Sequence, residues 1–340
     1  MKRLRRVLAL VPFFFGGSLF IGLIHKIGPA LVFSEVRQIG WGVALLVLTC
    51  GIRYFIRTLA WFFSIEPPSR KLSVFELFNI RLAGETFGEL MIAGLFVGES
   101  TKAIAASFRL PGLSAYSSIF IENLLFGLSV VVFLVMGASF LCYAAFFPAQ
   151  ILYFILIVSS LLLLCGSSLF LLLHWRRQVC SPLLNFLEKR QFGWKSLERQ
   201  AQPIRDFEEA VYGFYERHRK LFFVLLALEF STHWIGVLEA WWMLYWLQGK
   251  GTWQAAFLVE SVNRIVNSFF SLVPLRTGVD EGAMALLLRS IGYPGSVGIS
   301  LAIVRKVRLL FWMVPGLFLI GKYSFRPRGP RPVTGVSRQL

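Results

Sequence analysis

The sequence is short of charged residues, and of acidic residues above all. Only 16% of its 340 residues are charged, and 18 acidic residues stand against 35 basic ones. Hydrophobic residues make up 56% of the chain, with 34 Phe and 10 Trp, and the mean hydropathy is +0.66. Soluble domains carry about a quarter charged residues. The composition therefore excludes an ordinary soluble enzyme and predicts an integral membrane protein.

Other absences narrow the class further. The chain lacks the alternating apolar and polar runs of a membrane barrel, so the predicted fold class is an all-α polytopic membrane protein. The four cysteines, Cys50, Cys142, Cys165 and Cys180, lack the paired spacing of a metal or redox site. No P-loop, Ser-His-Asp set or zinc motif can be placed. We therefore expect no cofactor, no metal site, no catalytic residue and no enzyme activity.

The net charge of +17 is concentrated in three places. Basic residues gather at the amino end, in the stretch 175–220 and in the tail beyond residue 320, which contains no acidic residue. This distribution predicts topology and contact with anionic lipid rather than nucleic-acid binding. By the positive-inside rule, all three regions are expected in the cytoplasm, with both termini inside.

Six segments are apolar over the length that a spanning helix requires. They are about 7–24, 41–63, 115–140, 151–174, 221–247 and 296–320. Two further segments, 75–107 and 253–292, are apolar but interrupted by Gly, Asn and charged residues. With all basic regions on one side, each of these two must enter and leave the membrane on the same side. They are predicted as re-entrant helical hairpins of opposite orientation; the alternative is eight or more complete spans.

These segments predict a single transmembrane domain over residues 1–325. Repeat one covers about 41–140, repeat two about 221–320, and a cytoplasmic loop about 175–220 lies between them. Residues 326–340 form a basic tail that we expect to be disordered. A weak alignment of Arg81 with Arg264, and of Gly98-Glu99 with Asp280-Glu281, supports an inverted repeat, a plan shared by many secondary transporters.

The first interrupted segment, "RLAGETFGELMIAGLFVGESTKA", carries five charges. On a helix, Arg81, Glu85 and Glu89 lie on one face at spacings of i, i+4 and i+8, and Glu99 and Lys102 form an i, i+3 pair. The preceding span carries Arg53 and Arg57 with the same i, i+4 spacing. We expect these two arginines to meet the glutamates of the first hairpin.

The second interrupted segment repeats this chemistry. Glu260 and Arg264 are again i, i+4, and Pro274 and Gly278 break the helix in "SLVPLRTGVDEG". Carboxylates directly after this break suit the positive end of a new helix. The full set of candidate cavity residues is Arg53, Arg57, Arg81, Glu85, Glu89, Glu99, Lys102, Glu260, Arg264, Asn267, Asp280, Glu281 and Arg305.

Two interpretations of these charges remain open. They are either structural ion pairs that neutralise one another, or the lining of a polar cavity at mid-membrane, where charges are costly and mark functional sites. Glu122 fits the cavity or a helix contact. Glu229 and His233, one turn apart, are expected to form a hydrogen-bonded pair rather than a metal site.

The two interrupted segments, followed by "AIVRKVRLLFWMVPGLFLIG", resemble the lysylphosphatidylglycerol synthase transmembrane region family over nearly the whole chain. This family includes flippase-like and hopanoid-associated bacterial membrane proteins. The resemblance implies a lipid translocase-like fold in a bacterial cytoplasmic membrane. There is no room for the soluble synthase domain of two-domain members, so aminoacyl transfer is not implied. The chain departs from the family pattern at Met91-Ile92, at Val97-Gly98 and at Lys102.

The charged segments and the family resemblance together predict two alternative functions. The first is a lipid flippase that moves a lipid with an anionic or zwitterionic headgroup between leaflets. The second is an intramembrane enzyme or accessory protein in lipid modification, for example of hopanoid or polyprenyl-linked lipids. The expected partners are membrane lipids and possible lipid-biosynthesis proteins, with no nucleic acid, and the oligomeric state is not predicted.

Overall fold

The computed structural model describes residues 29–91, 94–144, 149–175, 182, 195–270 and 273–324. Within these ranges the chain forms α-helices and two short 3-10 turns, with no strand. The helices are α2 (Pro29–Ile39), α3 (Gly42–Ser64), α4 (Val74–Leu90), α5 (Gly94–Ser107), α6 (Gly112–Ala144), α7 (Ala149–His174), α9 (Lys195–Arg217), α10 (Arg219–Gln248), α11 (Trp253–Phe269), α12 (Val279–Ser290) and α13 (Gly295–Ser324). The turns are η1 (Pro67–Ser69) and η2 (Pro274–Arg276). The predicted all-α polytopic fold is confirmed.

Three helices in the described residues are long and apolar enough to cross a membrane by length and composition alone. They are α3, residues Gly112–Phe140 of α6, and α10. They coincide with three of the six predicted spans. The predicted spans 151–174 and 296–320 fall on α7 and α13, and the predicted first span lies outside the described residues. Although α13 has 30 residues, Arg305, Lys306 and Arg308 in its middle lower its hydropathy.

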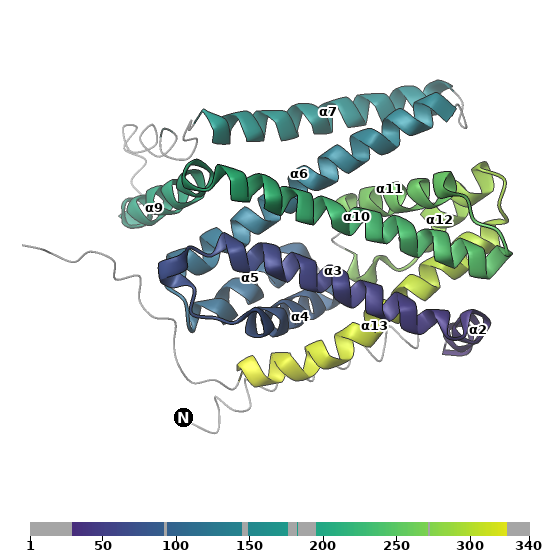
Figure 1. Cartoon of the computed structure of the whole chain (residues 1–340), viewed down its shortest axis with the longest axis horizontal. Helices are drawn as coiled ribbons and strands as arrows, with labels where there is room; N and C mark the ends of the chain where they lie inside the picture. Colours follow the sequence, from purple (N-terminus) through teal and green to yellow (C-terminus); the bar gives the residue numbers. More distant parts are fainter. Residues whose placement is uncertain are drawn as a thin grey trace, which may run out of the picture.

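The two interrupted segments each fold into a pair of helices. The first hairpin is α4 with α5, and the second is α11 with α12. Figure 1 shows that the first hairpin opens at the end of the bundle where α9 and the last turns of α13 lie, whereas the second opens at the opposite end. The turn η2, which lies between α11 and α12, contacts α4, so the tips of the two hairpins meet inside the bundle. This is the opposed arrangement that the charge distribution predicted.

Short local signals fix where the hairpin helices begin. Ser73 Oγ accepts a hydrogen bond from the Glu76 backbone N–H at 3.2 Å, and Glu76 accepts one from the Ser73 N–H at 3.0 Å. This reciprocal cap starts α4. Thr252 caps α11 by accepting from the Ala255 N–H at 3.2 Å. Both hairpins therefore begin at a residue that satisfies the free N–H groups of the first turn.

Two Gly-x-x-x-Gly motifs bring α4 and α5 into close contact. Gly84 and Gly88 lie on α4, and Gly94 and Gly98 lie on α5. A Cβ added to Gly94 would lie 2.0 Å from the Gly88 carbonyl oxygen, and one added to Gly98 would lie 2.9 Å from that of Gly84. Only glycine permits this backbone approach, which is a common way for membrane helices to associate. Both motifs are present in the sequence, but this helix contact was not among the predicted ones.

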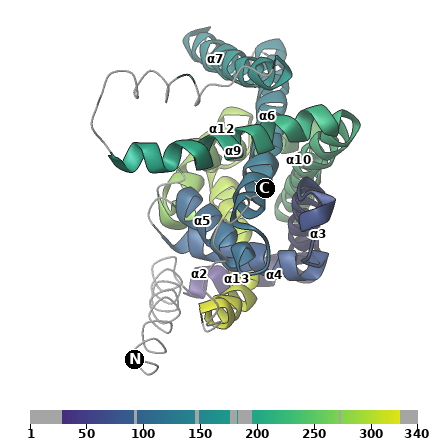
Figure 2. The same cartoon turned by 90° about the vertical axis from the view of Figure 1, so that its left-hand side faces the viewer.

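The remaining helices surround the two hairpins. In Figures 1 and 2, α7 lies at the edge of the bundle beside α6, and α9 runs across the end at which the first hairpin opens. Buried residues of α9, among them Phe214 and Tyr215, pack against α6 and α10. Thus residues 195–217 of the predicted loop 175–220 form a helix. Residues 176–181 and 183–194 of that loop, and the predicted tail 326–340, lie outside the described residues.

Candidate functional site: a charged cavity between two hairpins

Arg57 on α3 is the centre of an ion-pair group beside the first hairpin. Its Nη2 lies 2.7 Å from Glu122 Oε1 on α6. Its Nε lies 3.5 Å from Glu229 Oε2 on α10, and its Nη1 lies 3.9 Å from Glu85 Oε1 on α4. The side chains of Glu122 and Glu229 are 1% and 0% exposed, so they need a cation beside them to stay ionised in this setting. Arg57 therefore ties four helices together.

Arg81 and Lys102 lie behind the carboxylates of the first hairpin. Arg81 contacts Glu122 at 3.0 Å and Glu85 at 3.3 Å, and it donates a hydrogen bond to the Arg57 carbonyl oxygen at 3.1 Å. Lys102 Nζ lies 3.2 Å from Glu85 and 2.6 Å from Glu99. The two cationic side chains are 0% and 1% exposed, whereas Glu85 and Glu99 are 25% and 23% exposed. The carboxylates, not these two cations, thus face open space.

Glu260 on α11 is the corresponding centre beside the second hairpin. It lies 2.5 Å from Arg264 Nη2, 3.0 Å from Arg305 Nη2 on α13 and 3.7 Å from Arg53 Nη2 on α3. Its side chain is 0% exposed. A Cβ on Gly236 of α10 would lie 2.4 Å from Glu260 Oε1, so the missing side chain leaves room for the carboxylate. Three cations surround one buried carboxylate here.

Arg53 belongs to this second group, which corrects one expectation. It lies 3.3 Å from Glu239 Oε2 on α10, and Arg308 also contacts Glu239. We expected Arg53 and Arg57 to meet the first hairpin together. Arg53 lies one turn closer to the Gly42 end of α3, the end at which the second hairpin enters, so the nearest buried carboxylates are Glu239 and Glu260. Only Arg57 meets a glutamate of the first hairpin.

The hairpin tips are joined by Arg276 of η2 and Glu89 of α4. Arg276 Nη1 lies 3.3 Å from Glu89 Oε2, and Arg276 Nε lies 3.6 Å from Asp280 Oδ2. Next to this contact, Glu281 accepts a hydrogen bond from the Gly278 N–H at 2.7 Å and pairs with Lys306 of α13 at 2.5 Å. The carboxylates after the helix break therefore start α12, as predicted.

The ion pairs divide into two clusters of opposite charge. The first cluster comprises Arg57, Arg81, Lys102, Glu85, Glu99, Glu122 and Glu229. Its three cations face four carboxylates, a formal charge of −1. The second cluster comprises Arg53, Arg264, Arg276, Arg305, Lys306, Arg308, Glu89, Glu239, Glu260, Asp280 and Glu281. Its six cations face five carboxylates, a formal charge of +1, so the whole network is formally neutral.

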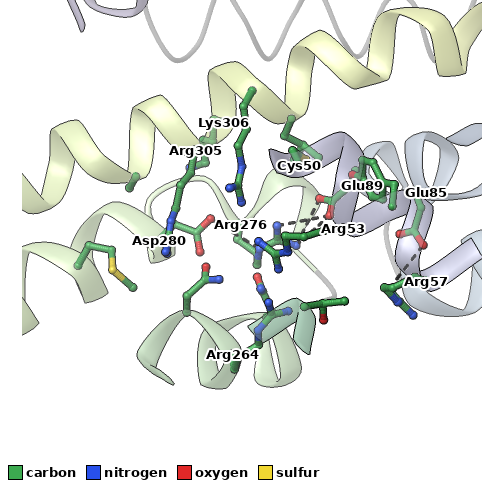
Figure 3. A pocket seen from close by; sticks show the side chains of 18 of the residues that line it. Cys50, Arg53, Arg57, Glu85, Glu89, Arg264, Arg276, Asp280, Arg305 and Lys306 are labelled. Carbon is green, nitrogen blue, oxygen red and sulfur yellow. Dashed lines mark hydrogen bonds and ion pairs between the residues drawn. The ribbon is translucent and has the colours of Figure 1, made fainter. Parts of the chain in front are cut away.

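Two cavities that share several lining residues lie along this network. The inner cavity has a volume of about 170 Å³ and lies between the clusters; its lining includes Arg53, Arg264, Arg276, Arg305 and Asp280. Figure 3 shows Arg264 on α11 and Arg305 on α13 pointing into it from opposite sides, with Arg276 between them. The cavity is small and strongly charged.

The outer cavity is larger, at about 950 Å³, and shares part of its wall with the inner one. Both are lined by Arg57, Glu85, Glu89, Phe126, Arg264, Asn267 and Arg276. From this polar end the outer cavity continues along apolar side chains of α6 and its neighbours, including Ile119, Val130, Leu134 and Leu162. The outer cavity therefore has a charged end and a long apolar end.

A comparison with known protein families identifies the group to which this architecture belongs. The family model for the lysylphosphatidylglycerol synthase TM region matches residues 7–316. The chain belongs to this family. A search of curated proteins and a search of solved structures find no match. Family membership places the chain in a membrane and connects it with membrane lipids.

Most of the predicted site residues belong to the two ion-pair clusters described above. The pairs Arg81–Glu85, Glu260–Arg264 and Glu99–Lys102 form as their helical spacing predicted. Asn267 lines both cavities. The expected bond between Glu229 and His233 is wrong, because His233 Nε2 pairs with Ser129 Oγ at 2.9 Å while Glu229 turns to Arg57. The spacing of one helical turn brings the two side chains within hydrogen-bonding distance, but each of them pairs with a residue on another helix instead.

Six residues of the network were not among the predicted site residues: Arg276, Glu122, Glu229, Glu239, Lys306 and Arg308. Arg276 lies in a turn next to proline, where a basic residue resembles an ordinary loop residue. Glu122, Glu229 and Glu239 are single acidic residues in otherwise apolar spans, and each pairs with an arginine far away in the sequence. The sequence feature that could have identified these three glutamates is their position within predicted spans, where an unpaired carboxylate would be costly. A single carboxylate in a predicted span therefore predicts a cationic partner on another helix.

Proposed function

We propose that this protein moves a lipid with a polar headgroup between the two leaflets of a membrane. The observation that carries the proposal is the outer cavity, whose charged end suits a headgroup and whose apolar end suits acyl chains. Ligand sites are concave, mainly apolar and equipped with a few placed polar groups. A cavity lined only by apolar side chains would bind tails without selecting a headgroup, and a purely polar one would exclude lipid.

Aromatic side chains along the outer cavity support access from the bilayer. Phe96 on α5 is 73% exposed and Phe269 at the end of α11 is 58% exposed. Tyr116 and Phe120 on α6 are about half exposed, and all four line the cavity. Exposed apolar side chains around an opening are suited to contact with lipid, so a lipid can enter sideways while its tails remain in hydrocarbon.

The opposed hairpins support the transport step. Many secondary transporters have two repeats of inverted orientation, with the substrate site at their interface and access alternating between the two sides. Here the two hairpin tips meet beside the inner cavity, at Arg276 and Glu89. In this proposal the charged groups of both tips hold the headgroup halfway, and the chain has no catalytic step.

The proposal also assigns an orientation. The basic ends of the chain and the basic region around α9 face the cytoplasm, as the positive-inside rule predicts. The first hairpin then enters from the cytoplasmic side and the second from the outer side of a bacterial inner membrane. The bound headgroup is anionic or zwitterionic, and lipid-biosynthesis proteins are candidate partners that supply or use the lipid.

A cavity-filling variant tests transport without disturbing the ion pairs. Gly127 on α6 lines the outer cavity, and a Cβ added there meets no described atom within 4 Å. We expect Gly127→Phe to fold normally and to abolish transfer of labelled lipid between leaflets in proteoliposomes. The matched control is Gly282→Phe, because Gly282 is exposed on α12 and equally free of described neighbours. Equal transfer by wild type, Gly127→Phe and protein-free vesicles would refute the proposal.

Cellular lipid analysis separates transport from the alternative of an enzyme or accessory subunit. A strain lacking the gene should keep its lipid species but change their distribution between leaflets. Loss of one lipid species from whole cells, together with unchanged leaflet distribution of the rest, would instead favour lipid modification.

A further inference from the structure

We infer that the transported lipid is a zwitterionic phospholipid with a primary amine, whose phosphate binds the second cluster and whose ammonium binds the first. This inference rests on the proposed transport function and names its substrate class. The argument starts from charge. The first cluster has a formal charge of −1 and the second +1, and residues of both clusters line the two cavities. A ligand with one positive and one negative group matches this division.

The phosphate site is marked by buried hydrogen-bond donors without partners. Within the described residues, Arg264 Nε and both Nε and Nη1 of Arg305 have no hydrogen-bond partner. The two side chains are only 7% and 8% exposed, and both line the inner cavity. Glu260 occupies only the Nη2 group of each arginine. Buried donors normally have partners, and guanidinium groups match phosphate oxygens in geometry and charge.

The ammonium site is marked by carboxylates that face open space. Glu85 and Glu99 are 25% and 23% exposed and line the outer cavity, whereas Arg81 and Lys102 lie behind them and are buried. A primary ammonium has three N–H donors for such carboxylates. A quaternary ammonium has none, and it binds preferentially to aromatic faces. The carboxylate wall therefore favours a primary amine over a trimethylated one.

The formal charge of the network favours a zwitterion over a simple anionic lipid. The complete network is neutral when all of its groups are ionised, so a headgroup with net charge would leave a buried charge unmatched. A zwitterion keeps the sum at zero and adds one favourable contact to each cluster. Arg264 and Glu85 line both cavities, so the two groups of one headgroup can reach both clusters.

Lipid binding tests the inference independently of transport. The purified full chain in detergent is titrated with phosphatidylethanolamine, phosphatidylcholine and phosphatidylglycerol of identical acyl chains, and its melting temperature is recorded. Glycerophosphoethanolamine and inorganic phosphate are titrated in parallel to separate a lipid from a free phosphate source. We expect phosphatidylethanolamine to bind at least about tenfold more tightly than the other two lipids, as one charge-assisted hydrogen bond provides. Equal binding of the three lipids, tighter binding of phosphatidylglycerol, or equal stabilisation by inorganic phosphate would each overturn it.

Two variants assign the two halves of the headgroup. Glu99→Gln should remove the preference for phosphatidylethanolamine over phosphatidylcholine and leave phosphatidylcholine binding unchanged. Arg305→Gln should weaken the binding of phosphatidylethanolamine and of phosphatidylcholine to the same extent, because both lipids carry the phosphate. The matched controls are Glu209→Gln and Arg289→Gln, which alter exposed side chains on α9 and α12. Should a variant fail to fold, the comparison of lipids on the wild-type chain still decides the question.

Transport assays with the same three lipids separate this inference from the proposed function. Selective binding of phosphatidylethanolamine without transfer of any lipid would support the headgroup assignment and refute transport. Transfer of phosphatidylglycerol in preference to phosphatidylethanolamine would support transport and overturn the headgroup assignment. Transfer of phosphatidylethanolamine ahead of both other lipids supports the two together.

Discussion

Arg276 and Glu89 join the tips of the two hairpins across 187 positions of sequence, with Arg276 Nη1 3.3 Å from Glu89 Oε1. Arg276 holds this position in a left-handed backbone conformation, with φ +47°, and Leu275 before it has φ +48°. Non-glycine residues rarely adopt such angles, which cost about 1–3 kcal/mol each and persist where the surrounding structure imposes them. The contact therefore holds a strained turn at the centre of the bundle.

The energy of this contact can be measured in a double-mutant cycle. We expect Glu89→Gln and Arg276→Gln each to lower the free energy of unfolding in detergent by about 1–3 kcal/mol, because each leaves a mostly buried partner without its counter-charge. The double variant should lose less than the sum of the two. Strictly additive losses would show that the two residues do not interact. Arg289→Gln is the control, since it removes an exposed guanidinium from the neighbouring helix.

Gly98→Ala should disrupt the first hairpin. The added methyl group would lie 2.9 Å from the Gly84 carbonyl oxygen and 3.4 Å from Gly88 Cα, and the helix backbone cannot move aside locally. We expect a loss of about 1–3 kcal/mol in the free energy of unfolding, the usual cost of forcing atoms into a packed contact. Gly282→Ala on α12, where no described atom lies within 4 Å, should be neutral or slightly stabilising. Equal stability of the two variants would contradict the close packing of α4 on α5.

Gly278→Ala isolates backbone strain from steric contact. Gly278 and Gly282 both have open space around an added Cβ within the described residues, but only Gly278 has a positive φ, of +90°. We expect Gly278→Ala to cost roughly 1–2 kcal/mol through backbone conformation alone. Thermal unfolding of both variants in the same detergent gives the comparison. A melting temperature for Gly278→Ala at or above that of Gly282→Ala would show that the turn relaxes freely.

The opposed hairpins predict labelling from opposite faces of the membrane. Lys71 is exposed at the opening of the first hairpin, and Lys250 is exposed at the opening of the second. In a chain whose four cysteines have been replaced, Lys71→Cys and Lys250→Cys should react with a membrane-impermeant maleimide from opposite sides. In intact cells we expect Lys250→Cys to react first, with Lys71→Cys reacting only after lysis. Reaction of both from one side would exclude the predicted topology.

Local spacing predicted the pairs within a helix but not the partners between helices. Arg81–Glu85 and Glu260–Arg264 follow directly from the i, i+4 rule. The destination of Arg53 does not, because it depends on which hairpin enters at each end of α3, and its partner Glu239 is 186 positions away. Likewise, hydropathy located both hairpins, whereas the contact between their tips depends on the turn at Leu275 and Arg276. A turn of non-glycine residues with positive φ has no clear sequence signal.

The position of Arg305, Lys306 and Arg308 in the middle of α13 has a consequence for biosynthesis. A helix with three central cations inserts poorly into a bilayer by itself, since each such charge costs about 3 kcal/mol on the insertion scale. Its carboxylate partners Glu239, Glu260 and Glu281 all precede it in the sequence and are synthesised earlier. We therefore expect α13 to insert after the helices that carry these carboxylates, and to be held in the membrane by pairing with them.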